Sequence, residues 1–350
     1  MIPIVMALLT VAALSACRIE RGPSTTAVAS TSTAPGGRVV LYTSAYREVT
    51  DALVALARTE LPDVQLEVFQ GGSEKVASRL DADLAAGRAG ADVLLVSDPF
   101  LSRRLKRDGE LLAYASPRAT PIDRRLVDLD NAFVAARVST MAVVWNTTTT
   151  TKEDAPTSLT SLLRGEDDRS ADLAFADPLS SGTAFMTAVV VGDGDVTYLK
   201  RLRARGASIA GGNAVVVQKV LSGERRFGVV LLENALTAEA RGEPLGWLVP
   251  DDTVVIPGDV SILNDTANPG AARAVVDLIL SPAGQAIIRG DDGRMHAVDP
   301  RVPPPKMQRD VVTLAALLDR RRVDPALLDR VVERRAAIQA ALEAALLSSP

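Results

Sequence analysis

Residues 39–44 read Val-Val-Leu-Tyr-Thr-Ser and residues 92–98 read Asp-Val-Leu-Leu-Val-Ser-Asp, and these two stretches decide the fold. Each is a short apolar run, typical of a buried strand, that ends in small polar residues. Between them, residues 49–57 and 76–84 repeat apolar side chains at helical spacing, and residues 64–68 alternate like a half-buried strand. Strands that alternate with helices over short connections predict an α/β fold with a parallel sheet.

The ends of these strands predict a site for an anion. Ligands of such sheets lie beyond the carboxyl ends of the strands, where the next helix begins. A helix N-terminus offers free N–H groups and a partial positive charge, which suits a negative ligand. Each residue taken alone is more often an ordinary helix cap, so the prediction rests on their combination. The candidates are Thr43, Ser44, Gly72, Ser73, Ser97 and Asp98.

The second half of the chain repeats the same arrangement. An apolar run over 173–176 leads into Asp-Pro-Leu-Ser-Ser-Gly-Thr at 177–183, and a helix follows to Val191. A further helix begins at Gly-Gly-Asn over 211–213, and an apolar run over 227–232 ends in a carboxylate and an amide. The second set of ligand-binding candidates is Ser180, Ser181, Gly182, Thr183, Asn213, Glu233 and Asn234.

Composition and charge exclude several classes of protein. Of 350 residues, 39 are Lys or Arg and 43 are Asp or Glu, for a net charge of -4, and aromatic residues are 3%. We therefore expect no nucleic-acid partner, which would need clustered positive charge and stacking platforms. One cysteine and one histidine exclude a disulfide framework and a multi-histidine metal site. We expect no metal and no cofactor.

The motifs of catalysis are also missing, which disfavours an enzyme. The first strand is not followed by GxGxxG, and neither a P-loop nor a GxSxG nucleophile elbow occurs. His296 lies in a stretch that resembles a loop, where a lone histidine is more often structural or exposed than a general base. The adjacent carboxylates at 251–252 and 291–292 are typical of solvated loop pairs.

The N-terminus predicts export. Residues 1–16 are apolar, too short to span a membrane and suited to a signal peptide, although no Lys or Arg precedes them. The segment ends Leu-Ser-Ala before Cys17 and resembles the lipobox of bacterial lipoproteins. The resemblance implies cleavage before Cys17, lipidation of its sulfur and a membrane anchor on the extracytoplasmic side. Residues up to 37, rich in Ser, Thr, Gly and Pro, predict a flexible tether.

The order of all these pieces resembles the extracytoplasmic solute-binding proteins of bacterial ABC importers, in the group that binds ferric ion, phosphonates and sugar phosphates. The likeness extends over about 38–347. It rests on the stretches 40–44, 91–98, 145–147, 176–183 and 281–285. It implies a two-lobed periplasmic-binding-protein fold of type II, with crossing strands at 138–144 and 248–258.

The same resemblance implies the division of the chain into lobes. The first lobe would comprise residues 38–139 and 257–305, and the second lobe residues 140–256. The C-terminal helices within 306–350 are assigned to neither lobe.

The resemblance also implies the function. The chain would act as a monomer that captures a small anionic solute between its lobes and delivers it to the permease and ATPase subunits of an importer. In such relatives the turn at 181–183 grips a phosphate, a phosphonate or a companion anion. Iron-binding relatives carry two tyrosines just after the strand that ends here at Leu232, where this chain has Asn234 and Ala235. Ferric iron is therefore disfavoured, and an organophosphate or phosphonate is favoured.

Two details of this function stay open at the level of sequence. Asp98 or Glu233 would suit an amine on the same ligand, or would only cap a helix or make a polar contact that closes the lobes. The same two-lobed protein would also serve as a surface-tethered sensor that signals to a partner protein, and an enzyme is a weaker alternative. A neighbouring permease and ATPase, a neighbouring kinase or receptor, or turnover of the ligand would distinguish the three.

Overall fold

The computed structural model describes residues 36–291, 293–305, 310–320 and 324–347. The apolar segment 1–16, Cys17 and most of the tether lie outside the described residues, so export and lipidation stay predictions.

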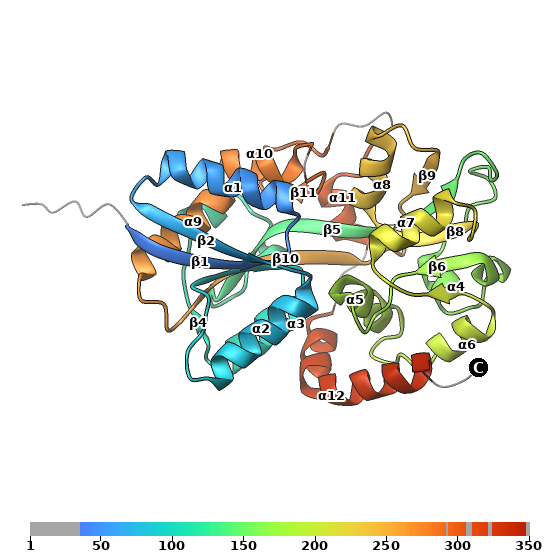
Figure 1. The fold of residues 1–350 in the computed structure, drawn as a ribbon, viewed down its shortest axis with the longest axis horizontal. Helices are drawn as coiled ribbons and strands as arrows, with labels where there is room; N and C mark the ends of the chain where they lie inside the picture. The colour runs from blue at the N-terminus through green and yellow to red at the C-terminus, as the bar shows by residue number, and fades with distance from the viewer. Residues whose placement is uncertain (1–35, 292, 306–309, 321–323, 348–350) are drawn as a thin grey trace, which may run out of the picture. The chain divides into compact units, whose positions relative to one another are not determined.

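The first lobe alternates strands and helices as the sequence predicts (Figure 1). Its elements are β1 (Gly37–Thr43), α1 (Arg47–Glu60), β2 (Val64–Gln70), α2 (Ser73–Ala85), β3 (Val93–Val96) and α3 (Pro99–Arg107). β1 pairs in parallel with β2 on one side and with β3 on the other. Val49 and Leu53 of α1 pack on one face of this sheet, and Leu80 of α2 and Leu105 of α3 on the other. All three strands therefore direct their carboxyl ends toward the same edge.

Two long strands connect the lobes, and they are antiparallel to each other. They are β5 (Phe133–Asn146) and β10 (Val255–Leu263). β10 also pairs with β3, so the strands follow one path, β2-β1-β3-β10-β5-β8-β6-β7. The prediction that a crossing strand begins at residue 248 was wrong, because residues 250–253 form a turn closed by the bond from the Thr253 N–H to the Pro250 carbonyl.

The second lobe forms around the other half of β5. Its strands are β6 (Leu173–Phe175), β7 (Ser208–Ile209), β8 (Phe227–Leu231) and β9 (Leu245–Leu248). Its helices are α4 (Leu159–Leu163), α5 (Gly182–Val191), α6 (Leu199–Ala204), α7 (Asn213–Leu221) and α8 (Leu232–Ala240). Every residue of α5 is buried, so this helix forms the centre of the lobe. The N-terminus of α5 is thereby held in a fixed place.

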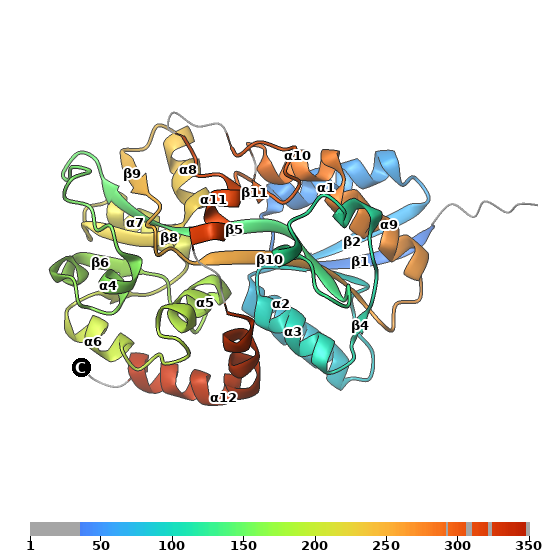
Figure 2. The same cartoon turned by 180° about the vertical axis from the view of Figure 1, so that it is seen from behind.

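The C-terminal elements divide between the lobes (Figure 2). They are α9 (Pro269–Leu280), α10 (Pro282–Arg289), β11 (His296–Ala297), α11 (Leu314–Arg320) and α12 (Pro325–Leu347). Leu317 and Leu318 of α11 pack into the core of the first lobe. Leu328 and Leu342 of α12 pack into the core of the second lobe. The helices that the sequence left unassigned therefore attach to different lobes.

Shorter elements complete the fold. They are β4 (Leu111–Leu112) and the 3-10 helices Pro117–Ala119, Arg124–Leu126 and Asp168–Asp172. Within the described ranges, no single helix is long and apolar enough to cross a bilayer. α9 and α10 pass that test only as a pair bent by 55°.

Two predictions about polar residues were wrong. His296 does not lie in a loop: it forms part of β11 and is 3% exposed, and its Nε2 contacts the Val312 carbonyl at 2.7 Å. Burial lowers the pKa of His296, so it is a neutral structural group. Asp252 is not simply solvated, because its carboxylate accepts the N–H groups of Leu159 and Thr160, each at 2.8 Å, at the start of α4.

Candidate functional site

The loops that follow β1 and β3 are joined by hydrogen bonds. Thr43 Oγ1 donates to the Leu95 carbonyl at 2.9 Å and accepts from the Ala45 N–H at 3.0 Å. Ser44 Oγ accepts the N–H of Ser97 at 3.0 Å. Thr43 is fully buried and uses its hydroxyl within the lobe, so it shapes the loop, whereas Ser44 is half-buried.

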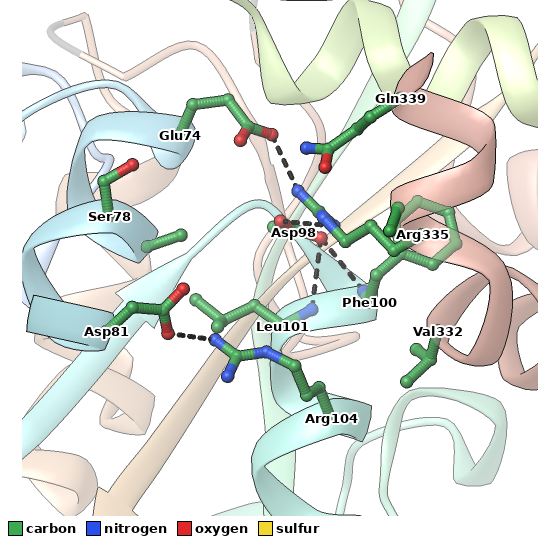
Figure 3. Close-up of a pocket in the computed structure, with 12 residues that line it drawn as sticks. Glu74, Ser78, Asp81, Asp98, Phe100, Leu101, Arg104, Val332, Arg335 and Gln339 are labelled. Carbon is green, nitrogen blue, oxygen red and sulfur yellow. Dashed lines mark hydrogen bonds and ion pairs between the residues drawn. The ribbon is translucent and has the colours of Figure 1, made fainter. Parts of the chain in front are cut away.

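Asp98 is bound within the protein by both carboxylate oxygens. Oδ1 accepts the N–H groups of Phe100 and Leu101, at 3.0 and 3.2 Å, and so caps α3. Oδ2 faces Nη1 of Arg335, on α12, at 3.5 Å (Figure 3). Asp98 was predicted to pair with an amine on the ligand, and in the structure it pairs with an arginine of the chain itself.

The N-terminus of α5 meets the N-terminus of α2. A Cβ atom on Gly182 would lie 2.9 Å from Cβ of Ser73, so only glycine permits this approach of the two lobes. Ser181 caps α5 by accepting the Ala184 N–H at 3.4 Å, and its hydroxyl lies 3.2 Å from that of Thr183. Two helix ends of the same partial charge thus come together, an arrangement that a negative group stabilises.

The remaining candidates in these loops differ in position. Gly72 is exposed at the cap of α2, and Ser180 is exposed with its hydroxyl 3.4 Å from the Asp177 carbonyl. Asn213 Nδ2 donates to Thr183 Oγ1 at 3.4 Å, and its Oδ1 accepts a backbone N–H at the end of β8 at 3.3 Å. Asn213 therefore holds the start of α7 against α5 and β8.

The interpretation of the sequence missed the most informative residue of this region, Arg137 of β5. Its side chain is almost completely buried, and the residue is 3% exposed. Nη2 donates to Ser44 Oγ at 3.2 Å, and Nη1 contacts the sulfur of Met295 at 2.9 Å. Nε has no hydrogen-bond partner in the described part of the protein. Burial lowers the pKa of Arg137, because a charged guanidinium is costly to remove from water.

A second unpartnered polar atom faces the same place. Ser97 Oγ is buried and has no partner among the described residues. A Cβ atom on Gly258, which pairs with Arg137 across β10, would lie 2.8 Å from Arg137 Nε and 3.1 Å from Ser97 Oγ. Buried donors without partners cost about 1–3 kcal/mol each, so the two point to a ligand that would supply the missing acceptor.

A carboxylate of the second lobe completes this cluster. Glu233 is 2% exposed, and its Oε1 accepts from the hydroxyl of Ser139 at 2.6 Å. Burial raises the pKa of Glu233 to about 6, against the opposing effects of the Ser139 hydrogen bond and the Arg137 charge. Next to it, the Tyr46 hydroxyl donates to Asn234 Oδ1 at 3.4 Å and so links α1 to α8.

Two cavities flank the boundary between the lobes. One of about 450 Å³ lies beside Tyr46 and Asn234, and its polar lining also includes Arg241 and Arg294. The other, of about 330 Å³, lies between α2, α3 and α12 (Figure 3). No three His, Cys, Asp or Glu side chains gather in a metal-binding arrangement in the ranges that the structure describes. The polar groups around Arg137 and Ser97, which line neither of these two cavities, suit hydrogen bonds to a small anion.

One signal for Arg137 was present in the sequence. It is the only charged residue in the run Phe-Val-Ala-Ala-Arg-Val-Ser-Thr-Met-Ala-Val-Val-Trp-Asn at 133–146. A charge within an otherwise apolar strand requires a partner or a function. The sequence alone does not say which loops surround it.

Comparison with known proteins agrees with this architecture. The model of the family described as "Bacterial extracellular solute-binding protein" matches residues 38–291. No curated protein matches the chain. Among solved structures, iron-bound HitA from Pseudomonas aeruginosa is similar, with TM-score 0.72 and 18% identity over 87% of this chain and 99% of that one.

Two further structures share the fold. AfuA from Actinobacillus pleuropneumoniae, with exogenous fructose-6-phosphate bound, has TM-score 0.73 and 20% identity over 89% of this chain and 99% of that one. A periplasmic thiamin binding protein has TM-score 0.69 and 16% identity over 89% and 96%. These likenesses establish the type II periplasmic-binding-protein fold that the sequence predicts. The chain belongs to the bacterial extracellular solute-binding protein family.

Proposed function

We propose that this protein captures a small anionic solute, preferably an organophosphate or a phosphonate, between its lobes and delivers it to the permease of an ABC importer. The observation that carries the proposal is the buried guanidinium of Arg137, whose Nε has no partner in the described residues. Ser97 Oγ adds a second unpartnered donor, and the N-terminus of α5 adds free N–H groups.

Binding would supply the acceptors that the cluster lacks. An anionic oxygen that reaches Nε of Arg137 would form a charge-assisted hydrogen bond, which is about twice as strong as a neutral one. The N-termini of α2 and α5 approach at Ser73 and Gly182, and a shared negative charge would stabilise their contact. Binding therefore favours the closed arrangement of the lobes, which a permease would recognise.

The residues at the start of α8 support the organic anion over iron, whereas the comparisons include both kinds of ligand. AfuA was solved with a sugar phosphate and HitA with iron, so both kinds of ligand occur on this fold. At the start of α8 this chain places Glu233 and Asn234, and the two adjacent tyrosines expected of iron-binding relatives are missing. Glu233 is the remaining carboxylate that would accept from an amine or a hydroxyl on the same solute, because Asp98 is engaged by Arg335.

A thermal-shift screen tests the ligand class. Phosphate, sulfate, phosphonates, sugar phosphates, carboxylates and ferric salts are each added to the purified protein. A phosphonate or sugar phosphate should raise the melting temperature in a saturable manner, because a ligand at a hundred times its Kd adds about 2.7 kcal/mol of stability. A shift only with ferric salts, or an equal shift after Arg137→Met, would contradict the proposal.

We propose further that Cys17 anchors the protein to the outer face of a bacterial membrane. The expected evidence is incorporation of labelled palmitate into the full chain expressed in a bacterium. Cys17→Ala should lose the label and be released from the membrane fraction. Equal labelling of both chains would contradict lipidation at this residue.

A further inference from the structure

α12 is attached to the second lobe along most of its length. Its apolar residues belong to the core that also contains α5 and α6: Leu327, Leu328, Val331, Ile338, Leu342 and Ala345. Arg203 of α6 donates to the carbonyl of Ala345 at 3.0 Å, and Arg330 of α12 pairs with Asp193 at 3.4 Å. These contacts anchor α12 to the second lobe, while its other side lies against α3 of the first lobe.

Two side chains of α12 form ion pairs with the first lobe. Asp329 pairs with Arg103 of α3 at 3.0 Å, and its side chain is 60% exposed. Arg335 makes the better shielded contact. Nη2 of Arg335 lies 3.0 Å from Oε1 of Glu74, the second residue of α2, and Nη1 lies 3.5 Å from Oδ2 of Asp98, the cap of α3. The guanidinium also stacks over the ring of Phe185, on α5, at 4.8 Å. Figure 3 shows both carboxylates directed at this one arginine from two helices. We name these four residues, Arg335, Glu74, Asp98 and Phe185, the interlobe clasp.

The clasp is better shielded from water than the other ion pairs of α12. The side chains of Arg335 and Glu74 are 21% and 24% exposed, and that of Asp98 is 3% exposed. The pair of Arg330 with Asp193 is 50% and 80% exposed, and it lies entirely within the second lobe. Exposed pairs contribute little and shielded ones contribute more, so the clasp is the stronger of the two.

The clasp lies beside the point where the lobes touch. Glu74 follows Ser73, which packs against Gly182 at the start of α5. The aromatic ring of Phe100, next to Asp98 in the first lobe, meets that of Phe185 edge to face at 5.6 Å. Separation of the lobes would break both ion pairs of Arg335 and expose these contacts.

We propose that Arg335 is a positioning residue that sets the affinity of the interlobe site by holding the ligand-free lobes closed. The inference rests on the opening and closing that the proposed function requires, but not on the identity of the solute. If only the closed form binds tightly, the apparent Kd equals the intrinsic Kd divided by the closed fraction. A weaker clasp therefore lowers affinity without touching the ligand.

The test measures the distance between the lobes without any ligand. In the full chain with Cys17→Ser, spin labels are placed at Glu48→Cys on α1 and Arg241→Cys after α8, which line opposite sides of the 450 Å³ cavity. Arg335→Gln should raise the long-distance population about threefold to tenfold, the effect of losing a partly shielded ion pair. Arg330→Gln, on the same helix, is the matched control and should leave the distribution unchanged.

Two more variants guard against a trivial result. Glu74→Gln breaks the same pair from the first lobe and should shift the distribution in the same direction, and Arg335→Lys should restore part of the closed population. Melting temperatures verify that each variant is folded. Identical distributions in the parent, Arg335→Gln and Glu74→Gln would overturn the proposal, as would an equal shift in Arg330→Gln. Neither result depends on whether Arg137 binds an anion.

Discussion

Two arginines lie at the boundary between the lobes, and the protein surrounds them in opposite ways. Arg335 faces carboxylates with both of its Nη atoms and stacks on an aromatic ring. Arg137 is more deeply buried, yet its contacts are a serine hydroxyl and a methionine sulfur, and its Nε is unpartnered in the described structure. The first arginine has partners within the fold, whereas Nε of the second has no hydrogen-bond partner among the described residues. The hydrogen-bond and ion-pair partners of an arginine, and not its charge alone, would distinguish a structural arginine from one that binds a ligand.

The largest expected effect comes from exchanging each arginine for methionine. Arg137→Met should raise the melting temperature of the ligand-free protein, because a buried guanidinium that has no carboxylate within hydrogen-bond distance is removed. The same change should weaken the anion found by screening about a hundredfold, since loss of a buried charged contact costs about 2–5 kcal/mol. Differential scanning fluorimetry and isothermal calorimetry measure the two effects.

Arg335→Met is the contrasting variant. It leaves Glu74 and Asp98 without their cation, so it should lower the melting temperature of the ligand-free protein. If both methionine variants moved the melting temperature in the same direction, the distinction between the two arginines would be lost.

Glu233 gives the next effect, through pH. The folded pKa of about 6 lies above the ordinary value of 4.5, so the folded state binds a proton more readily than the unfolded state. Glu233 should therefore contribute a free energy of unfolding that rises as pH falls through about 6, by about 2 kcal/mol once pH is below 4.5. Buried His296, whose pKa is lowered, contributes a loss in the same pH range, so the Glu233 contribution is read as the difference between the parent and Glu233→Gln. Urea denaturation of ligand-free protein between pH 7.5 and 4.5 measures this change.

Glu233→Gln shows how much of the pH dependence comes from this carboxyl and how much from other groups. Its amide oxygen can still accept from Ser139, and the variant should be more stable than the parent at pH 7.5 and gain less on acidification. Asp259, whose pKa desolvation also raises to about 6, and Glu74, whose pKa desolvation also raises, contribute gains of the same sign in both proteins. A pH profile that is identical in the parent and the variant would exclude Glu233 as a source of the gain.

The turn at the start of α5 has a smaller effect. Ser181→Ala combined with Thr183→Ala should weaken binding of the anion about tenfold, because two adjacent hydroxyls at the start of α5 are lost. Calorimetry with the same anion measures the change. Ser180→Ala is the neighbouring control, since its exposed hydroxyl lies against a backbone carbonyl and should contribute little. Unchanged affinity in the double variant would remove this turn from the site.

Ser97 gives the smallest effect and the sharpest comparison with Thr43. Ser97→Ala removes a hydroxyl without a described partner, so it should weaken the anion only severalfold and leave ligand-free stability unchanged. Thr43→Val removes a hydroxyl that makes two hydrogen bonds, and it should lower stability by about 1 kcal/mol or more. Equal stability losses in the two variants would show that Ser97 Oγ has a structural partner.

Local sequence patterns predicted the alternating strands and helices of both lobes, because the spacing of apolar residues that distinguishes a strand from a helix is visible within a few residues. They also predicted which loops end at the boundary, including Ser97 and the turn at 181–183. They could not predict that β9 ends at Leu248 and that β10 begins at Val255, since both segments are apolar and the turn between them is short.

The hydrogen-bond and ion-pair partners of the polar residues could not be predicted from the sequence. Asp98 is bound by Arg335, which is far away along the chain, and only tertiary packing brings α12 to α3. Arg137 stands out as a lone charge in β5, but its unpartnered state depends on Ser44, Met295 and Gly258. Whether a buried polar group finds a hydrogen-bond partner depends on the folded core as a whole, so no short stretch of sequence reveals it.

β5 is a single strand of 14 residues that pairs with β10 in its first half and with β8 in its second. Arg137 stands only a few residues before the change from one partner to the other. A rotation of one lobe against the other is therefore a torsion of the backbone that bears the guanidinium. If Arg137 binds the solute as proposed, its ligand would bias that torsion, so ligand recognition and lobe movement would be coupled through this one strand.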